Sequence, residues 1–195
     1  MGFSTLLDIL GSVVIGGLLL MILLSLNDAA VRNSYIYNGD AILQENLVEV
    51  VKLIEFDFRQ MGYTSDWANA DPSAPAITSA DSTSISFIVD GSVINYFVGP
   101  TSELLNTPNP NDKILYRSVN GGTPLSSNMG ITKFDLSYYK IFGDTLAMPV
   151  PTNKLGEIET IQIDIEIEDV YGYDTTYAKT AWRQIRMSSR NRNKR

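Results

Sequence analysis

The chain has 195 residues, 44% of them apolar, so we expect one modest domain with a core of its own. It contains neither cysteine nor histidine, which excludes a disulfide framework, a thiol nucleophile, an imidazole base and an ordinary zinc or haem site. The net charge is −7, but every charged residue after Trp182 is basic, and the part before it carries 9 basic against 22 acidic residues. A body this acidic does not offer the basic surface that binding to nucleic acid requires.

An apolar stretch dominates the start of the chain. Residues 9–26 contain no charge, and the apolar character extends back to Leu6 and Leu7. About 20 helical residues cross the hydrocarbon core of a bilayer. The stretch is longer than the core of a signal peptide, and neither a basic leading region nor a small-x-small cleavage site accompanies it. We therefore predict a retained transmembrane anchor helix over residues 1–27.

Small and acidic residues interrupt this anchor. Gly11, Gly16 and Gly17 would let a second helix approach closely, although glycine is also common in membrane spans in general. Asp8 lies at the edge of the span, where a carboxylate either marks a partner or rests in the head-group region, favoured by the helix dipole. We take Asp8 and the three glycines as candidate helix-packing residues.

An amphipathic helix is predicted to continue the anchor over residues 28–62. Its apolar residues recur every three or four positions, which places them on one face. They are Leu43, Leu47, Val50, Val51, Ile54, Phe58 and Met61. Charged residues fill the other face, and Gly62 is a natural stop after the last turn. We expect an interruption at most at Asn38-Gly39.

Residues 63–182 are predicted to form an antiparallel sheet. After a loop over residues 64–80, apolar and polar residues alternate, which turns one face of each strand toward a core. The strand segments are 84–90, 93–99, 113–119, 131–142, 158–170 and 177–188. Gly91-Ser92 is the expected two-residue turn between the first two. The predicted fold class is α+β, a long N-terminal helix packed on an antiparallel sheet.

The motifs do not indicate a catalytic or metal site. Ser137 and Lys140 have the spacing of acyl-serine enzymes, but at this spacing on a strand they point to opposite faces. Asp164, Glu166 and Glu168 are of the type that binds calcium. Because alternate strand positions lie nearly 7 Å apart, we interpret them as a solvated face. We expect no enzyme activity, no cofactor and no bound metal.

The C-terminal residues 183–195 are predicted to form a basic tail. It is either a disordered, solubilising end or a contact for anionic lipid head groups or an acidic partner. Its basic residues are Arg183, Arg186, Arg190, Arg192, Lys194 and Arg195. Three tyrosines precede it, Tyr171, Tyr173 and Tyr177, and they serve either recognition or packing on the sheet.

The order of these parts resembles the type IV pilin-like family, and the body resembles PilW-type minor pilins and the J-type minor pseudopilin of type II secretion. The likeness rests on FDFRQMGY (56–63), an acidic-x-Arg-x-small-Gly-Tyr helix end, and on SISFIVDGSVINYFVG (84–99). It continues through residues 114–143 to a closing strand with Trp182, and so covers nearly the whole chain.

The resemblance implies a location and a role. It implies an anchor in the inner (cytoplasmic) membrane, an extracytoplasmic C-terminal domain and a place at the tip of a pilus or pseudopilus. Gly2-Phe3 would be the processing site, and Asp8 would pair with the N-terminal amine of a neighbouring subunit. The implied partners are other pilin-like subunits and the lipid bilayer, without nucleic acid. We expect a non-enzymatic subunit that helps initiate or cap a filament through helix packing.

Two alternatives remain open. The family carries Glu as its fifth mature residue, whereas a chain starting at Phe3 has Leu7 fifth and Asp8 sixth. The first alternative is therefore an uncleaved single-pass scaffold subunit of a membrane or envelope complex that uses the same fold. The second is a membrane-tethered ligand-binding module. Charge alone leaves the orientation unsettled, because Arg32 and Lys52 share the flank after the span with several acidic residues.

Overall fold

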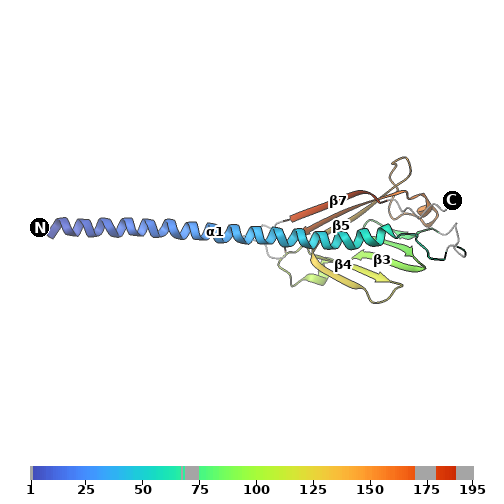
Figure 1. Ribbon diagram of the computed structural model, residues 1–195, viewed down its shortest axis with the longest axis horizontal. Helices are drawn as coiled ribbons and strands as arrows, with labels where there is room; N and C mark the ends of the chain where they lie inside the picture. Colours follow the sequence, from blue (N-terminus) through green and yellow to red (C-terminus); the bar gives the residue numbers. More distant parts are fainter. Residues whose placement is uncertain (1, 67, 69–74, 170–178, 188–195) are drawn as a thin grey trace. The chain divides into compact units, whose positions relative to one another are not determined.

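The computed structural model describes residues 2–66, 68, 75–169 and 179–187. The chain divides into two compact units, Met1–Gly39 and Asp40–Arg195. Helix α1 (Gly2–Arg59) supplies the whole described part of the first unit and the opening segment of the second (Figure 1). Its backbone is helical through Asn38 and Gly39 as well, so the interruption considered at that point is not present. A single glycine costs a helix only about 1 kcal/mol.

The second unit contains one antiparallel sheet of seven strands whose spatial order follows the chain. The strands are β1 (Ile77–Ala80), β2 (Ser84–Val89), β3 (Ser92–Val98), β4 (Lys113–Val119), β5 (Leu125–Tyr139), β6 (Thr160–Glu168) and β7 (Lys179–Met187). Two short 3-10 helices, Thr101–Leu104 and Thr152–Glu157, lie in the connections. A helix on an antiparallel sheet confirms the predicted α+β class.

The strand prediction is wrong about the first hairpin turn and about the segment before it. Val89 pairs with Ser92, so the hairpin turn is Asp90-Gly91, one residue earlier than predicted. Both turn residues have a positive φ, 48° and 76°, as a two-residue turn of type I′ requires. The segment predicted as loop contains strand β1. This strand is only four residues long and buries only its two end residues, so it shows no alternation that periodicity could detect.

Strand β5 is longer than predicted because it continues through a glycine. It begins at Leu125 rather than Ile131, and its pairing with β6 shifts register near Ile131. Gly130 has a φ of 71° and lies so close to the backbone of β6 that a Cβ would collide with the carbonyl oxygen of Glu168. Glycine therefore allows an irregular strand to keep its neighbour.

The core of the second unit lies between one face of the sheet and the segment of α1 that starts at Asp40 (Figure 1). Of the predicted stripe, Val51 is partly buried, and the others are buried: Leu43, Leu47, Val50, Ile54, Phe58 and Met61. Strand β6 contributes its four isoleucines, which alternate with half-exposed polar residues as predicted. The Phe58 ring meets the Phe87 ring edge-on at 5.0 Å. The helix ends at Arg59, and Gly62, with a φ of 72°, lies in the turn after it and donates from its N–H to the Ile88 carbonyl at 2.7 Å.

Candidate functional site

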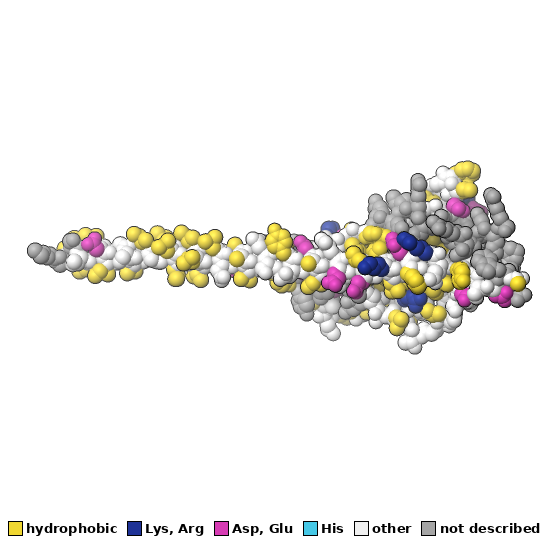
Figure 2. Space-filling view, viewed as in Figure 1, with side chains coloured by type: hydrophobic (Ala, Val, Ile, Leu, Met, Phe, Trp, Pro, Cys, Tyr) yellow, Lys and Arg dark blue, Asp and Glu magenta, His cyan; other side chains and the backbone are white. Residues whose placement is uncertain are grey.

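The first unit exposes nearly all of its apolar side chains. From Phe3 to Leu26 the large apolar residues are between 54% and 81% exposed, and hydrophobic side chains line this part of α1 in the space-filling view (Figure 2). In the part of the chain that the structure describes, this is the one helix long and apolar enough to cross a membrane. Such a surface is unfavourable in water, by about 25 cal/mol for each Å², so it requires lipid or other apolar helices around it.

The hydroxyl groups inside this stretch are satisfied within the helix. Ser12 and Ser25 each donate from Oγ to the backbone carbonyl three residues earlier, Ile9 and Ile22, at 2.8 Å. In a bilayer there is no water to accept these bonds, so internal partners are needed. The hydroxyl groups of Ser12 and Ser25 are therefore compatible with immersion in lipid.

Small and polar residues lie along one side of the same stretch. Asp8, Ser12 and Gly16 follow each other at intervals of four and share a helix face. A Cβ added at Gly11, Gly16 or Gly17 would meet no atom within 4 Å. The glycines are therefore open notches, and Asp8 is exposed and has no ion-pair partner among the described residues.

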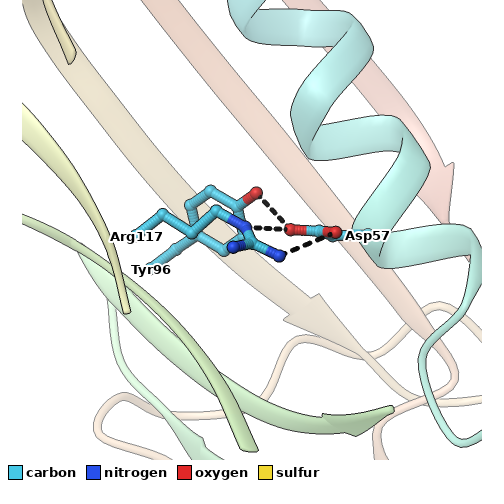
Figure 3. A network of polar contacts seen from close by, with 3 residues as sticks. All are labelled: Asp57, Tyr96 and Arg117. Carbon is cyan, nitrogen blue, oxygen red and sulfur yellow. Dashed lines mark hydrogen bonds and ion pairs between the residues drawn. The ribbon is translucent and has the colours of Figure 1, made fainter. Parts of the chain in front are cut away.

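A second polar constellation lies in the second unit, at the last turn of α1 (Figure 3). Asp57 accepts hydrogen bonds from Arg117 on β4, Nε to Oδ2 at 2.6 Å and Nη2 to Oδ1 at 3.3 Å. Tyr96 on β3 donates to Oδ2 of the same carboxylate at 2.6 Å. The side chain of Asp57 is 3% exposed and that of Arg117 is 21% exposed. One carboxylate thus ties the helix to two strands.

The electrostatics of this constellation keep the Arg117 guanidinium charged and the Tyr96 phenol neutral. The hydrogen bond to Asp57 raises the pKa of the Arg117 guanidinium, and burial, with the Asp57 bond as the next cause, raises the pKa of the Tyr96 phenol. Tyr96 therefore stays a neutral donor. All three groups are occupied with one another, which is the arrangement of a structural lock rather than of a general acid or base.

Sequence reasoning missed this lock, although a signal was present. Asp57 lies three residues after Ile54 and four before Met61, on the buried stripe itself. A carboxylate at a core position needs a buried cationic partner. Arg117, on a predicted strand, could have been that cationic partner. Local periodicity does not reveal a pair of residues that lie 60 positions apart in the sequence.

A groove of about 380 Å³ opens beside the lock. Leu53 of α1 and Leu125 of β5 line it, and both are exposed. Arg117 and Tyr96 form part of its wall, together with Ser127. Its surface is mostly apolar, so it is a place for an apolar contact and not for chemistry on a polar substrate.

The serine–lysine spacing does not form a nucleophile. Lys140 pairs with Glu157 at 2.7 Å, and this hydrogen bond raises the pKa of the lysine. A general base needs the opposite shift, toward neutral pH. Among the β6 acids, Glu166 pairs with Lys179 at 3.0 Å and Asp164 accepts a bond from Gln162 at 2.8 Å. They form a half-exposed polar face, close to the interpretation made from sequence.

Several predicted residues lie outside the described part of the chain. These are Tyr171, Tyr173, Tyr177, Arg190, Arg192, Lys194 and Arg195. The backbone of Arg183 and Arg186 is part of β7, within the strand predicted over residues 177–188, so the residues assigned to the tail overlap this strand up to Met187. Phe3, on the predicted processing site Gly2-Phe3, is exposed.

Comparison with known proteins gives no match: no family model, no curated protein and no solved structure is significantly similar to this chain.

Proposed function

We propose that this chain is a membrane-anchored, non-enzymatic subunit of a filament of pilin-like proteins, and that it acts in starting or capping that filament. The observation that carries the proposal is the composition of α1. Its uncharged, exposed stretch over residues 9–26 runs on into a segment that packs on an antiparallel sheet. One helix thus provides both the anchor and the spine of the folded domain.

Exposure of the anchor supports assembly through helix packing. The large apolar residues from Phe3 to Leu26 are all more than half exposed within their own chain. The open notches at Gly16 and Gly17 allow another backbone to approach to short range. Asp8 on the Ser12–Gly16 face offers a carboxylate to a cation, such as the amine of a neighbouring chain. A buried carboxylate is retained in lipid only when it finds such a partner.

In this proposal the folded domain presents its loops to the outside and does not catalyse a reaction. Several of its polar groups are joined to one another, as in the Asp57–Arg117 pair and the Lys140–Glu157 pair. The groove lined by Leu53 and Leu125 offers an apolar contact instead. The domain would face the extracytoplasmic side of the inner membrane, as the resemblance to minor pilins and pseudopilins implies.

An uncleaved single-pass scaffold subunit is the second candidate, and the position of Asp8 favours it. Counted from Phe3, Asp8 is the sixth residue and not the fifth. The intact mass of the protein extracted from its native membrane separates the two candidates. Loss of Met1-Gly2, with a methyl group on Phe3, supports the filament subunit. A mass that retains Gly2 and Phe3 contradicts processing and supports the scaffold.

A further inference from the structure

Two large apolar side chains are exposed on the turn that follows β5. Ile141 is 72% exposed, and Phe142, at 90%, is the most exposed large apolar residue in the part of the chain that the structure describes. Turns of this kind usually hold glycine, proline, asparagine, aspartate or serine, which suit their geometry. Turn formation therefore does not account for these two residues, which we term the apolar turn.

Hydrogen bonds on either side hold the apolar turn in one shape. The N–H of Gly143 donates to the carbonyl of Lys140 at 2.9 Å, and the N–H of Lys140 donates to the carbonyl of Asp144 at 2.8 Å. Gly143 has a φ of 89°, the left-handed conformation that closes a three-residue hairpin loop. The ammonium of Lys140 also pairs with Glu157 at 2.7 Å. A surface that is ordered in advance loses less conformational entropy when it binds.

The opposite end of β5 carries the groove lined by Leu53 and Leu125. Leu125 is the first residue of β5 and is 68% exposed, and Leu53 is 47% exposed. Ser127 lines the same groove, and its buried hydroxyl oxygen has no hydrogen-bond partner among the residues that the structure describes. Such a hydroxyl is unfavourable until it meets a partner. The groove thus offers apolar walls and one unused hydrogen-bond donor.

The apolar turn matches these properties of the groove. Ile141 and Phe142 supply the apolar side chains, and their carbonyl groups accept no hydrogen bond from the described backbone. One of these carbonyls can therefore accept a bond from the hydroxyl of Ser127. The groove volume of about 380 Å³ is that of a small ligand pocket and accommodates the ring of a phenylalanine. Insertion would remove two exposed apolar surfaces from water at once.

The apolar turn and the groove of one chain are too far apart to meet. They lie at the two ends of β5, whose 15 residues at about 3.3 Å each separate them by roughly 40 Å or more. A chain therefore cannot fill its own groove with its own apolar turn. A second copy can do so, because it carries the same turn on the same rigid strand.

The charges around the apolar turn favour a protein partner over a lipid surface. Lys140 interacts with both Glu157 and Asp144, and Lys154 acts on Glu157 as well. Two lysines and two acids thus balance in this part of the described structure. Surfaces that bind anionic lipid carry an excess of basic residues. A neutral surface also lets two copies approach each other although the whole chain has a net charge of −7.

We propose that two copies of this chain bind head to tail through their folded domains, with the apolar turn of one copy in the groove of the next. The contact is heterologous: a pair keeps one free turn and one free groove, so further copies can add to it. It is small, and therefore weak unless the chains are concentrated, as they are in a membrane. The inference goes beyond the proposed function, because it involves neither the processing site nor the packing faces of the anchor.

Cross-linking between cysteine variants tests the contact while keeping its apolar residues. The chain has no cysteine, and Asp144→Cys and Ser126→Cys place single thiols at exposed positions beside the apolar turn and at the groove. The two full-length variants, one of which carries an affinity tag, are inserted together into vesicles of neutral lipid and treated with a short bismaleimide. We expect the mixed dimer to form at least about tenfold faster than the dimer of either variant alone.

A change in the apolar turn should abolish this product. Phe142→Ser, added to Asp144→Cys, should reduce the mixed dimer by at least about tenfold. Leu105→Ser is the matched control, because it removes a leucine that is 82% exposed elsewhere in the domain and should leave the yield unchanged. Equal melting temperatures show that both variants stay folded. The anchor is unaltered throughout, so the comparison does not depend on the helix packing of the proposed function.

Two results would overturn the proposal. The first is a mixed dimer that forms no faster than the dimer of either variant alone, which would leave the apolar turn to lipid or to a different protein. The second is a mixed dimer that survives Phe142→Ser, which would place the contact between copies elsewhere on the domain.

Discussion

Arg117 binds the carboxylate of Asp57 through two hydrogen bonds, 2.6 Å and 3.3 Å long, that join positions 60 apart in the sequence. Replacing Asp57 with Asn leaves the guanidinium without its counter-charge in a mostly buried place. We expect the free energy of unfolding to fall by about 2–4 kcal/mol. Equilibrium urea unfolding of the full chain in detergent, followed by tryptophan fluorescence, measures this loss.

Glu55→Gln is the matched control for that experiment. It removes the exposed pair between Glu55 and Arg59, whose charged atoms lie 3.3 Å apart on the same turn of α1. An exposed pair of this kind contributes about 0.5 kcal/mol or less. Equal losses in Asp57→Asn and Glu55→Gln would contradict the assignment of Asp57 as the buried lock between helix and sheet.

Stability should decline in alkaline solution because of two buried tyrosines. Burial raises the pKa of both Tyr96 and Tyr138, whereas an unfolded tyrosine titrates near pH 10. Above that pH the unfolded state releases protons that the folded state retains, so folding loses about 1.4 kcal/mol per pH unit for each tyrosine. Below about pH 10 both states are protonated and the two tyrosines add no pH dependence.

Unfolding free energies between about pH 8 and 11 test this sign. Tyr138→Phe should reduce the alkaline slope by roughly half, since one of the two groups is removed. It also removes the bond from the Tyr138 hydroxyl to the Asp81 carbonyl at 2.9 Å, so a lower stability at neutral pH accompanies the change. A slope that is the same in Tyr138→Phe and the wild type would refute the explanation.

Neighbouring residues of α1 that differ in burial should respond differently to truncation. Ile54 is 0% exposed in the core and Leu53 is 47% exposed. We expect Ile54→Ala to cost about 3–4 kcal/mol and Leu53→Ala about 1 kcal/mol or less. Thermal unfolding monitored by near-ultraviolet circular dichroism reports both. Similar losses at the two positions would mean that the groove at Leu53 is as well packed as the core.

A charge at the middle of the anchor should prevent stable insertion. Leu18 lies at the centre of the uncharged residues 9–26, where arginine costs about 3 kcal/mol by insertion scales. We expect Leu18→Arg to shift protein from the membrane fraction to the alkaline carbonate extract. Leu26→Arg, at the edge of the span, should stay in the membrane, because its side chain can reach the head groups. Equal extraction of the two variants would argue against a spanning anchor.

Periodicity predicted the elements that have a clear inside and outside. The isoleucines of β6 and the stripe from Leu43 to Met61 are buried as expected, because burial on one face produces the pattern in the sequence. Periodicity failed where a strand does not alternate regularly between buried and exposed residues. Strand β1 is too short to alternate, and the irregularity at Gly130 hides the first residues of β5.

The polar contacts could not be predicted in the same way. The partners of Asp57 depend on which strands become neighbours, and no local spacing encodes that. The hairpin turn was predicted one residue too late. Asp90-Gly91 and Gly91-Ser92 are both dipeptides that suit a two-residue turn, and the structure uses the first. The anchor was easier to predict, since length and absence of charge are properties of one segment alone.

The central claim is that the anchor joins this chain to other subunits, and cysteine cross-linking in native membranes tests it most directly. The chain has no cysteine, so Gly16→Cys places one reactive thiol in the notched face of the helix, and Asp144→Cys places one on the folded domain as the control. A thiol-reactive reagent with a photoactivated group that inserts into C–H bonds links the cysteine to whichever side chain lies next to it, and the adducts are identified by mass spectrometry. We predict that Gly16→Cys is cross-linked to the N-terminal helix of a pilin-like subunit and that Asp144→Cys is not. A Gly16→Cys chain that stays monomeric in the membrane, without any helical neighbour, would contradict the claim.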